Sequence, residues 1–264
     1  ISTYGEPSLA IDKINLKSTK NQKVIDKKNY HLILDPKEID NWIKEAEEVG
    51  EIAVDTETSS LDPHQANLIG VSLSCKIGKA CYIPIGHDSK KNINKDIVLN
   101  KLKPLLEDPS IKKIGQNIKF DFIVLFKHGI NISSMEDTML MSYVLDAGKN
   151  RHNMDTLSQI HLNHKTITFK DLVGTGKKEI NFSEVNIEKA KDYAAEDADI
   201  TFRLYKKFHK SLKDEKMFNI YEVFEKPMIK ILAFMEIEGI KIDNEFLKFL
   251  SSKFEKKIEK IQNE

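Results

Sequence analysis

Apolar residues recur along this chain with two different spacings, and each spacing predicts a type of element. Compact apolar runs that suit strands occur at 31–34, just before Asp55, at 68–74 and at 80–85, with a turn at Gly78 between the last two. Residues 36–49 have helical spacing and lie between the first two runs. Neighbouring strands followed by alternating helices and strands predict an α/β protein, a mixed sheet flanked by helices.

A long helix is predicted over residues 187–207, where one stripe at helical spacing is apolar except for Asp197. Tyr193 lies four residues before Asp197, so the two side chains are neighbours on that stripe. A tyrosine at this spacing is more often core packing, but a carboxylate is rarely placed against a core without a partner. The adjacent acids Glu196 and Asp199 project elsewhere, and we expect them to be solvated.

The pattern changes after Phe208. Residues 221–238 are strongly helical, and Pro227 marks either a kink or the true first turn. Gly239 stops that helix, and Asn244 starts an amphipathic helix that runs to the end. Because the chain starts at Ile rather than Met, we expect a fragment with a linker at 1–28, an α/β domain at 29–210 and a helical segment at 211–264.

The strand at Asp55 carries the first candidate chemistry. Asp55 and Glu57 are two residues apart in an extended segment, so both carboxylates point to one face and repel each other. No Lys or Arg occurs between Glu51 and Asp62 to neutralise them. A hard divalent cation with oxygen ligands, Mg²⁺ or Mn²⁺, is the natural partner. Taken alone, a D-x-E pair is more often a solvated turn.

A second acid follows a strand and a tight turn at 111–117. There Asn117 is expected to cap a helix that Gly129 closes. Asp121 falls in the first turn of this helix, where an acid also complements the helix dipole. The position therefore leaves a ligand role and a dipole role equally open.

Three motifs, taken together, point to a known family. They are D-T-E-T-S-S-L at 55–61, G-Q-N-I-K-F-D at 115–121 and Y-A-A-E-D-A-D at 193–199. In order and spacing they resemble the 3′ to 5′ proofreading exonuclease domain of bacterial family A DNA polymerases, in the tyrosine subclass of the DEDD exonucleases. The resemblance runs from about residue 30 to the C-terminus. It implies a ribonuclease H-like fold for 29–210 and the helical start of a truncated polymerase domain for 211–264.

The resemblance also implies a mechanism and a set of site residues. Two divalent metal ions, Mg²⁺ or Mn²⁺, would bind to Asp55, Glu57, Asp121 and Asp197, with Asp55 bridging them. Tyr193 and Glu57 would orient the attacking water at the 3′ end of single-stranded DNA, releasing a 5′ mononucleotide. Substrate contacts are expected from Leu61, Asn117 and Phe169, although core packing for the two apolar residues and capping for Asn117 remain open.

Composition agrees with a folded protein that is not membrane-bound. The chain of 264 residues is 40% hydrophobic and 31% charged, enough for one sizeable core and a smaller module. No apolar run suits a membrane span and no leader is seen at the N-terminus, so we expect a cytoplasmic monomer. Cys75 and Cys81 lack a C-x-x-C pattern and are expected to be reduced thiols. His161 and His164 are assigned no metal.

The charge is zero overall but is segregated along the sequence. Acids gather around 51–62, whereas Lys-rich stretches occur at 90–91, 177–178 and 206–216, and Arg occurs at Arg151 and Arg203 alone. Lysine surfaces hold phosphates without reading base edges, which predicts sequence-independent backbone binding. The loop at 174–178 lacks Walker spacing and is expected beside the substrate groove.

Two other functions stay open at this point. An exoribonuclease of the RNase D type would carry the same acids and tyrosine, and the polymerase-like C-terminal segment favours DNA over RNA. A catalytically silent spacer domain would be expected to have lost acids, whereas all four are present here.

Overall fold

The computed structural model describes residues 25–176 and 179–263 of the chain. Most of the linker predicted at 1–28, and Lys177 and Lys178 of the loop at 174–178, lie outside the described residues. The chain divides into two compact units, Ile1–Ala233 and Phe234–Glu264. The domain boundary expected at residue 210 stays a prediction.

The first unit is built on a six-stranded sheet with the order β1-β4-β3-β2-β5-β6. Its strands are β1 (Tyr30–Leu32), β2 (Glu51–Thr58), β3 (Leu68–Lys76), β4 (Lys79–Pro84), β5 (Lys112–Gly115) and β6 (Met135–Asp137). β2, β3 and β4 pair in antiparallel fashion, whereas β1, β5 and β6 join the sheet in parallel. The sheet is therefore mixed, as the sequence predicts.

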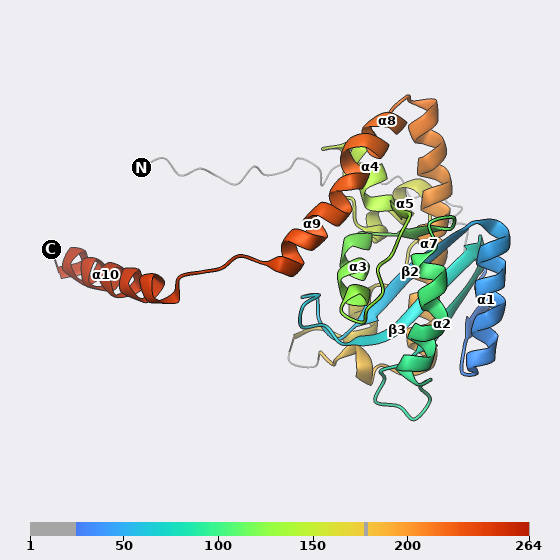
Figure 1. Ribbon diagram of the computed structural model, residues 1–264, viewed down its shortest axis with the longest axis horizontal. Coiled ribbons are helices and arrows are strands. Elements are labelled where there is room, and N and C mark those ends of the chain that lie inside the picture. Colours follow the sequence, from blue (N-terminus) through green and yellow to red (C-terminus); the bar gives the residue numbers. More distant parts are fainter. Residues whose placement is uncertain (1–24, 177–178, 264) are drawn as a thin grey trace. The chain divides into compact units, whose positions relative to one another are not determined.

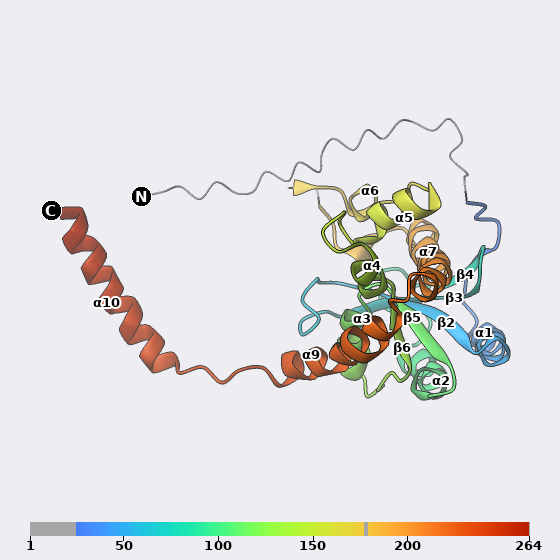
Figure 2. The same ribbon diagram turned by 90° about the horizontal axis from the view of Figure 1, so that it is seen from above.

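Helices cover both faces of this sheet (Figure 1). In the first unit they include α1 (Pro36–Val49), α2 (Lys95–Glu107), α3 (Ile118–Phe126), α4 (Thr138–Asp146), α5 (Met154–Leu162), α6 (Phe169–Val173), the 3-10 turn η3 (Phe182–Glu184) and α7 (Ile187–Asp214). α7 packs along β2, β3 and β4 on one face, and α1 and α2 lie side by side on the other (Figure 2). The face under α7 is the one that carries the acidic residues.

Local signals at the element ends agree with the sequence. α1 begins after Asp35, whose carboxylate accepts a hydrogen bond from the Lys37 amide at 2.9 Å, and it ends at Gly50 with φ of 76°. The strand limits differ from the expected 31–34, 68–74 and 80–85 by one or two residues at the ends. Cys75 and Cys81 are buried, unbridged thiols on adjacent strands, as predicted.

The expectation that Glu196 and Asp199 are solvated is wrong. α7 extends beyond 187–207 to Asp214 and is enclosed on more than one side, so both acids are fully buried. Glu196 is bound by the side chains of Lys27 and His164, each at 2.8 Å, and by the amide of Ile167 at 2.7 Å. Asp199 is bound by the Tyr30 hydroxyl, the Gly78 amide and Arg203. Buried acids of this kind are compensated structural groups.

The segment after α7 is helical over 221–238, as predicted, but it is not one regular α-helix. α8 (Phe218–Ile220) leads into a π-helical turn, η4 (Tyr221–Glu225), which is followed by α9 (Lys226–Glu238). Pro227 directly follows the π-helical turn in a helical path that runs without a break from Phe218, so it marks an irregularity inside a helix and not a true first turn. Gly239 ends α9 with φ of 68°, and α10 (Asn244–Asn263) starts at the predicted residue.

Candidate active site

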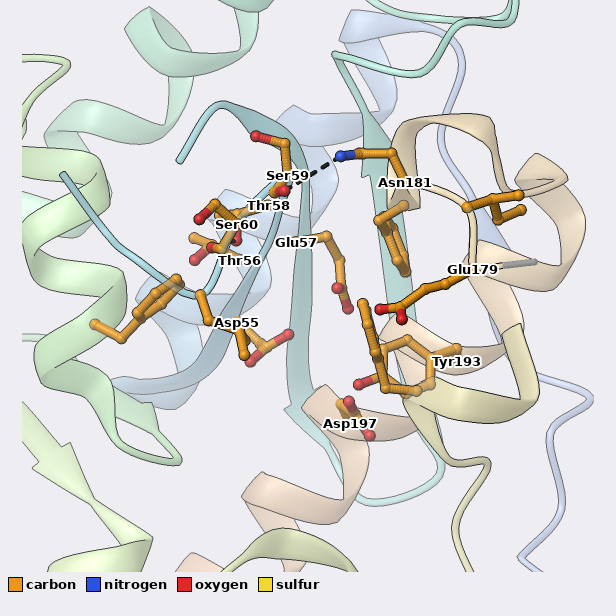
Figure 3. A pocket seen from close by; sticks show the side chains of 15 residues that line it. Asp55, Thr56, Glu57, Thr58, Ser59, Ser60, Glu179, Asn181, Tyr193 and Asp197 are labelled. Carbon is orange, nitrogen blue, oxygen red and sulfur yellow. Dashed lines mark hydrogen bonds between the residues drawn. The ribbon is translucent and has the colours of Figure 1, made fainter. Parts of the chain in front are cut away.

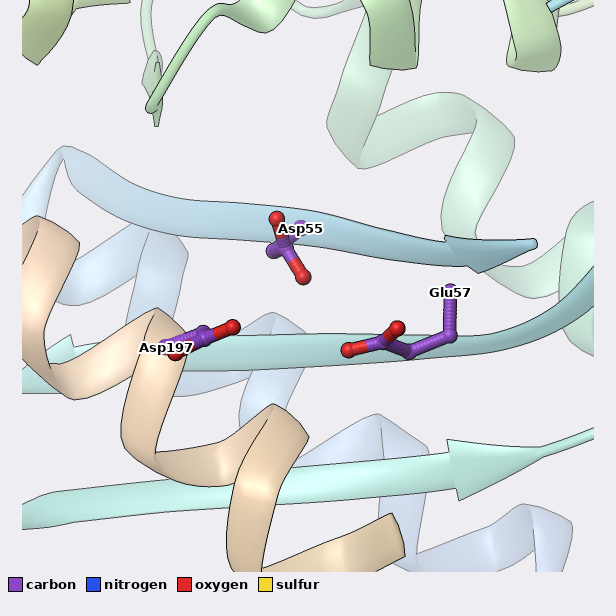
Figure 4. A group of neighbouring side chains, drawn as sticks. All are labelled: Asp55, Glu57 and Asp197. Atoms are coloured by element: carbon purple, nitrogen blue, oxygen red, sulfur yellow. The ribbon is translucent and has the colours of Figure 1, made fainter. Parts of the chain in front are cut away.

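The candidate site forms where β2 extends beyond its neighbour β5. β2 pairs with β5 from Glu51 to Ala53, so Asp55 and Glu57 lie on the part of β2 beyond that pairing. Being two residues apart, they project to the same face of the sheet. Asp197 points at them from α7, and an oxygen atom of each carboxylate lies within 4.8 Å of the others (Figure 4). The structure therefore confirms that residues from β2 and α7 converge.

The three carboxylates are poorly solvated and repel one another when ionised, so their pKa values are raised. Burial raises the pKa of Asp55 to about 6. Burial, and after it the charges of Asp55 and Asp197, raise the pKa of Glu57 well above its ordinary value. Burial and then Asp55 likewise raise the pKa of Asp197. Glu57 Oε1 is buried without a hydrogen-bond partner among the described residues, so a cation between the carboxylates would satisfy it and reverse these shifts.

Asp121 stands beside this group and is held by Thr56, the residue between Asp55 and Glu57. Asp121 Oδ1 accepts hydrogen bonds from the Thr56 amide at 2.9 Å and from Thr56 Oγ1 at 2.6 Å. Burial, and after it the charge of Asp55, raise the pKa of Asp121, although the bonds from Thr56 lower it. All four predicted acids therefore meet in one place, with Asp121 just outside the tightest group.

A tight turn between β5 and α3 places Asp121 in the first turn of α3. A Cβ atom at Gly115 would lie 2.7 Å from Cβ of Ile118, and Asn117 has φ of 63°, a conformation that Asn tolerates better than most residues. The predicted side-chain cap by Asn117 is wrong, because a capping residue reaches the helix amides from an extended backbone and Asn117 is left-handed. The amides of Asn117 and Ile118 donate to the Asp137 carboxylate, at 3.1 and 3.0 Å.

Tyr193 joins the carboxylates to a small aromatic group. Its ring contacts Phe169 and the buried Phe182, with ring centroids 6.4 and 6.1 Å away, and Phe169 stacks on Phe182 at 6.1 Å. The Tyr193 hydroxyl lies next to Asp197, one turn further along α7 (Figure 3). Burial, and after it the charge of Asp197, raise the pKa of Tyr193, which keeps its proton on the hydroxyl. The ring is thus a packing group and the hydroxyl a polar group aimed at the acids.

These side chains line a cavity of about 450 Å³ with the carboxylates in its wall (Figure 3). Leu61 and Phe169 also line it, and they are 91% and 40% exposed, so neither is a core residue. Asn181 Nδ2 donates to the Ser59 carbonyl at 3.2 Å across the rim (Figure 3). Asn117 is exposed and is not one of the residues that line the cavity, so its substrate contact stays a prediction.

Sequence reasoning missed two contributors to the site. Thr56 lies between the two acids on β2, and the alternation of a strand gives it no role in the acidic site. Its amide and hydroxyl nevertheless hold Asp121. Glu179 lies beside Tyr193 in the cavity (Figure 3), and it comes from a loop with no periodic pattern. A carboxylate on an irregular loop gives no signal in the sequence that would place it there.

Comparison with known proteins was informative over most of the chain. Residues 30–213 match the 3′–5′ exonuclease family. DNA polymerase I of Rhizobium leguminosarum is 39% identical in an alignment of length 260 that covers 90% of this chain and 26% of that protein. DNA polymerase I of Pseudomonas aeruginosa is 41% identical in an alignment of length 226 that covers 83% of this chain and 25% of that protein. The chain thus spans about a quarter of the length of these relatives.

Solved structures resemble the fold at low sequence identity. Pol1 from M. smegmatis, bound to a DNA primer-template and dNTP, gives a TM-score of 0.70 at 19% identity, covering 87% of this chain and 36% of that one. Brucella melitensis NrnC gives 0.58 at 23%, with 81% and 89% covered. Escherichia coli RNase D, an exoribonuclease, gives 0.57 at 17%, with 78% and 50% covered. These likenesses confirm the ribonuclease H-like fold.

Proposed function

Because the chain belongs to the 3′–5′ exonuclease family, we propose that this domain removes nucleoside 5′-monophosphates from single-stranded or frayed DNA 3′ ends, as a proofreading activity. The observation that carries the proposal is the convergence of Asp55, Glu57 and Asp197 within 4.8 Å in the wall of a cavity. A silent spacer domain would not require four acids, three of them buried and Asp55 half-buried, to be held together against their mutual repulsion.

The donor set fits divalent metal, and we propose two ions, Mg²⁺ or Mn²⁺. Three carboxylates that lie close together, one with a buried and unpartnered oxygen, match the preference of these ions for oxygen ligands. Asp55, Glu57 and Asp197 would hold one ion, and Asp121 together with Asp55 would hold the other. When bound, such ions make a coordinated water more acidic and offset charge on the leaving oxygen. Thr56, next to Asp55 in the sequence, fixes the Asp121 carboxylate against β2.

The remaining side chains bind and orient the substrate. The Tyr193 hydroxyl, next to Asp197, can accept and donate hydrogen bonds and so can align a water for attack on the terminal phosphodiester. Leu61 and Phe169 offer exposed apolar surface on which unpaired bases can stack whatever their identity. We propose a monomer, and we place it in the cytoplasm with its bacterial relatives. Within the described residues there is no helix with the length and apolar content of a membrane span.

The substrate assignment predicts an order of rates on labelled oligonucleotides. Single-stranded DNA should be shortened fastest, a duplex with mismatched 3′ ends more slowly and a matched duplex most slowly, because bases must unpair before the terminus reaches the carboxylates. The preference for mismatched ends over matched ends should shrink as the temperature rises. The measurement is a gel assay in Mg²⁺, Mn²⁺ or EDTA, with single-stranded RNA as a parallel substrate.

The same assay can overturn the assignment. Removal of matched duplex ends as fast as single strands would contradict the single-strand site and the proofreading role. RNA shortened faster than DNA would favour an RNase D-like exoribonuclease. Activity that persists in EDTA would contradict the metal assignment.

Tyr193→Phe should lower the single-turnover rate by between about ten- and a hundredfold, since it removes the hydroxyl that aligns the water. Its ring contacts with Phe169 and Phe182 are kept, so folding and Mn²⁺ binding should be unchanged. Rapid-quench kinetics with saturating metal measure the effect, and Tyr143→Phe, at a half-exposed tyrosine, is the control. An unchanged rate would leave Tyr193 as a packing residue.

A further inference from the structure

The hydroxyl of Tyr221 links the helical segment after α7 to the edge strand β6. Tyr221 is fully buried, and it lies in the π-helical turn η4. Its hydroxyl donates to Glu136 Oε2 at 2.9 Å and accepts from the Asp137 amide at 2.9 Å. Glu136 is 2% exposed, and its other oxygen pairs with Lys226 at 2.6 Å. All these polar groups are satisfied in a region closed to water.

Asp137 is the next link, and its carboxylate serves two helices. Oδ1 accepts from the amides of Asn117, Met139 and Leu140, and Oδ2 accepts from the amide of Ile118 at 3.0 Å. The first amides of α3 and α4 are therefore held by one side chain. Tyr221 fixes the backbone of that same residue, so the start of α3 is tied through Asp137 to η4.

The start of α3 determines where Asp121 stands. Asp121 lies in the first turn of α3, four residues after Asn117, and its carboxylate is fixed against Thr56 on β2. A shift of the α3 N-terminus would move Asp121 relative to Asp55, which stays on the sheet. Hydrogen bonds at Asp137 and Asp121, joined by the covalent chain of Asp137 and of the first turn of α3, thus connect Tyr221 to the acidic site.

We propose that Tyr221 is a positioning residue for the exonuclease reaction: its hydroxyl holds Asp137, and through it the N-terminus of α3 and the Asp121 carboxylate. This inference rests on the exonuclease function proposed above. A role in stability alone is the competing explanation, because α3 also buries Phe122, Ile123, Val124 and Leu125 completely. The two explanations differ in whether metal affinity depends on the hydroxyl of a residue that the active-site cavity does not include.

Tyr221→Phe is compared with Tyr205→Phe as a matched control. Both tyrosines are buried in the same apolar cluster, but the Tyr205 hydroxyl accepts a long bond of 3.4 Å from Lys112 and no described bond joins it to Glu136 or Asp137. We expect Tyr221→Phe to weaken Mn²⁺ binding about fivefold in calorimetry, the effect of one lost hydrogen bond on the Asp121 position. At limiting Mn²⁺ its kcat on single-stranded DNA should fall by a similar factor with KM unchanged, and excess Mn²⁺ should restore it. Tyr205→Phe should match the wild type in both.

The outcomes separate the inference from the proposed function. Wild-type Mn²⁺ affinity in folded Tyr221→Phe, or an equal loss in Tyr205→Phe, would overturn the positioning role and leave the exonuclease function standing. A wild-type chain that neither binds Mn²⁺ nor hydrolyses DNA would overturn both. If Tyr221→Phe does not fold, Asp137→Asn tests the next link, because it replaces one of the two carboxylate oxygens that hold the amides of Asn117 and Ile118. It should weaken Mn²⁺ binding in the same direction, and unchanged binding would count against the inference.

Discussion

Replacing Asp55 with Ala should abolish detectable Mn²⁺ binding and lower the single-turnover rate of DNA hydrolysis at least about a thousandfold, several kcal/mol of lost transition-state stabilisation. Asp55 has the largest expected effect because its charge acts on Glu57, Asp121 and Asp197 alike. Calorimetry with Mn²⁺ and rapid-quench kinetics measure the two effects. Asp96→Ala, at an exposed acid in the first turn of α2, is the control for loss of one negative charge.

Although Asp55→Ala should lose metal binding and activity, the folded protein should become more stable without metal at pH 8. Burial raises the pKa of Asp55 from 3.8 to about 6, so at intermediate pH the folded chain keeps a proton that the unfolded chain has lost. Stability due to this group therefore falls as the pH rises from 3.8 to about 6 and stays low above that pH. In EDTA, Asp55→Ala should melt at a higher temperature than the wild type at pH 8, and the difference should vanish near pH 4. Metal binding equal to the wild type, or a difference independent of pH, would contradict the assigned role of Asp55.

Replacing Glu196 with Ala should lower the free energy of unfolding by about 3 kcal/mol, the cost of removing one partner from a buried ionic group. Burial by itself would raise the pKa of Glu196, but the hydrogen bonds from His164, the Ile167 amide and Lys27 lower it. The carboxylate thus contributes stability at neutral pH, and that stability is lost as the pH falls through its folded-state pKa. Urea unfolding at pH 7 measures the change.

The control for Glu196 lies on the same helix. Glu188 is in the first turn of α7 with a half-exposed side chain paired loosely with Lys191, so Glu188→Ala should cost a few tenths of a kcal/mol. A loss at Glu196 no larger than this would mean that Glu196 is solvated, as the sequence pattern suggests. Because neither residue lines the cavity, both variants should keep wild-type Mn²⁺ affinity per folded molecule.

Much of the fold followed from local patterns. α1, α10 and the stop at Gly239 were predicted at the observed positions, since caps, glycine conformations and helical spacing are properties of neighbouring residues. The placement of Asp55 and Glu57 on the same face of β2 likewise depends only on their spacing of two residues. The convergence of β2, α3 and α7 on one site, however, was implied by the family resemblance of the three motifs and not by any spacing.

The errors have a common physical cause. Glu196 and Asp199 were expected to be solvated because helical spacing shows one buried stripe, whereas α7 is also covered on other sides, where Lys27 binds Glu196 and Tyr30 binds Asp199. Asn117 was expected to cap α3 because asparagine is common at helix N-termini. Its backbone is left-handed, however, and the first amide of α3 donates to the Asp137 carboxylate instead. Each error arose where a distant residue supplied the partner that local reasoning sought nearby.

By itself the sequence determined the residue types of the site, the elements that carry its acids, and which acids share a strand face or a helix stripe, because these depend on spacings of two and of about 3.6 residues. The tertiary structure alone decided which partner each buried polar group would have. Thr56 holds Asp121, Asp137 holds the start of α3, and Tyr221 holds Asp137. These three pairs of residues are 65, 19 and 84 positions apart in the sequence. No local pattern encodes such separations, since each pairing depends on how the sheet brings the segments together.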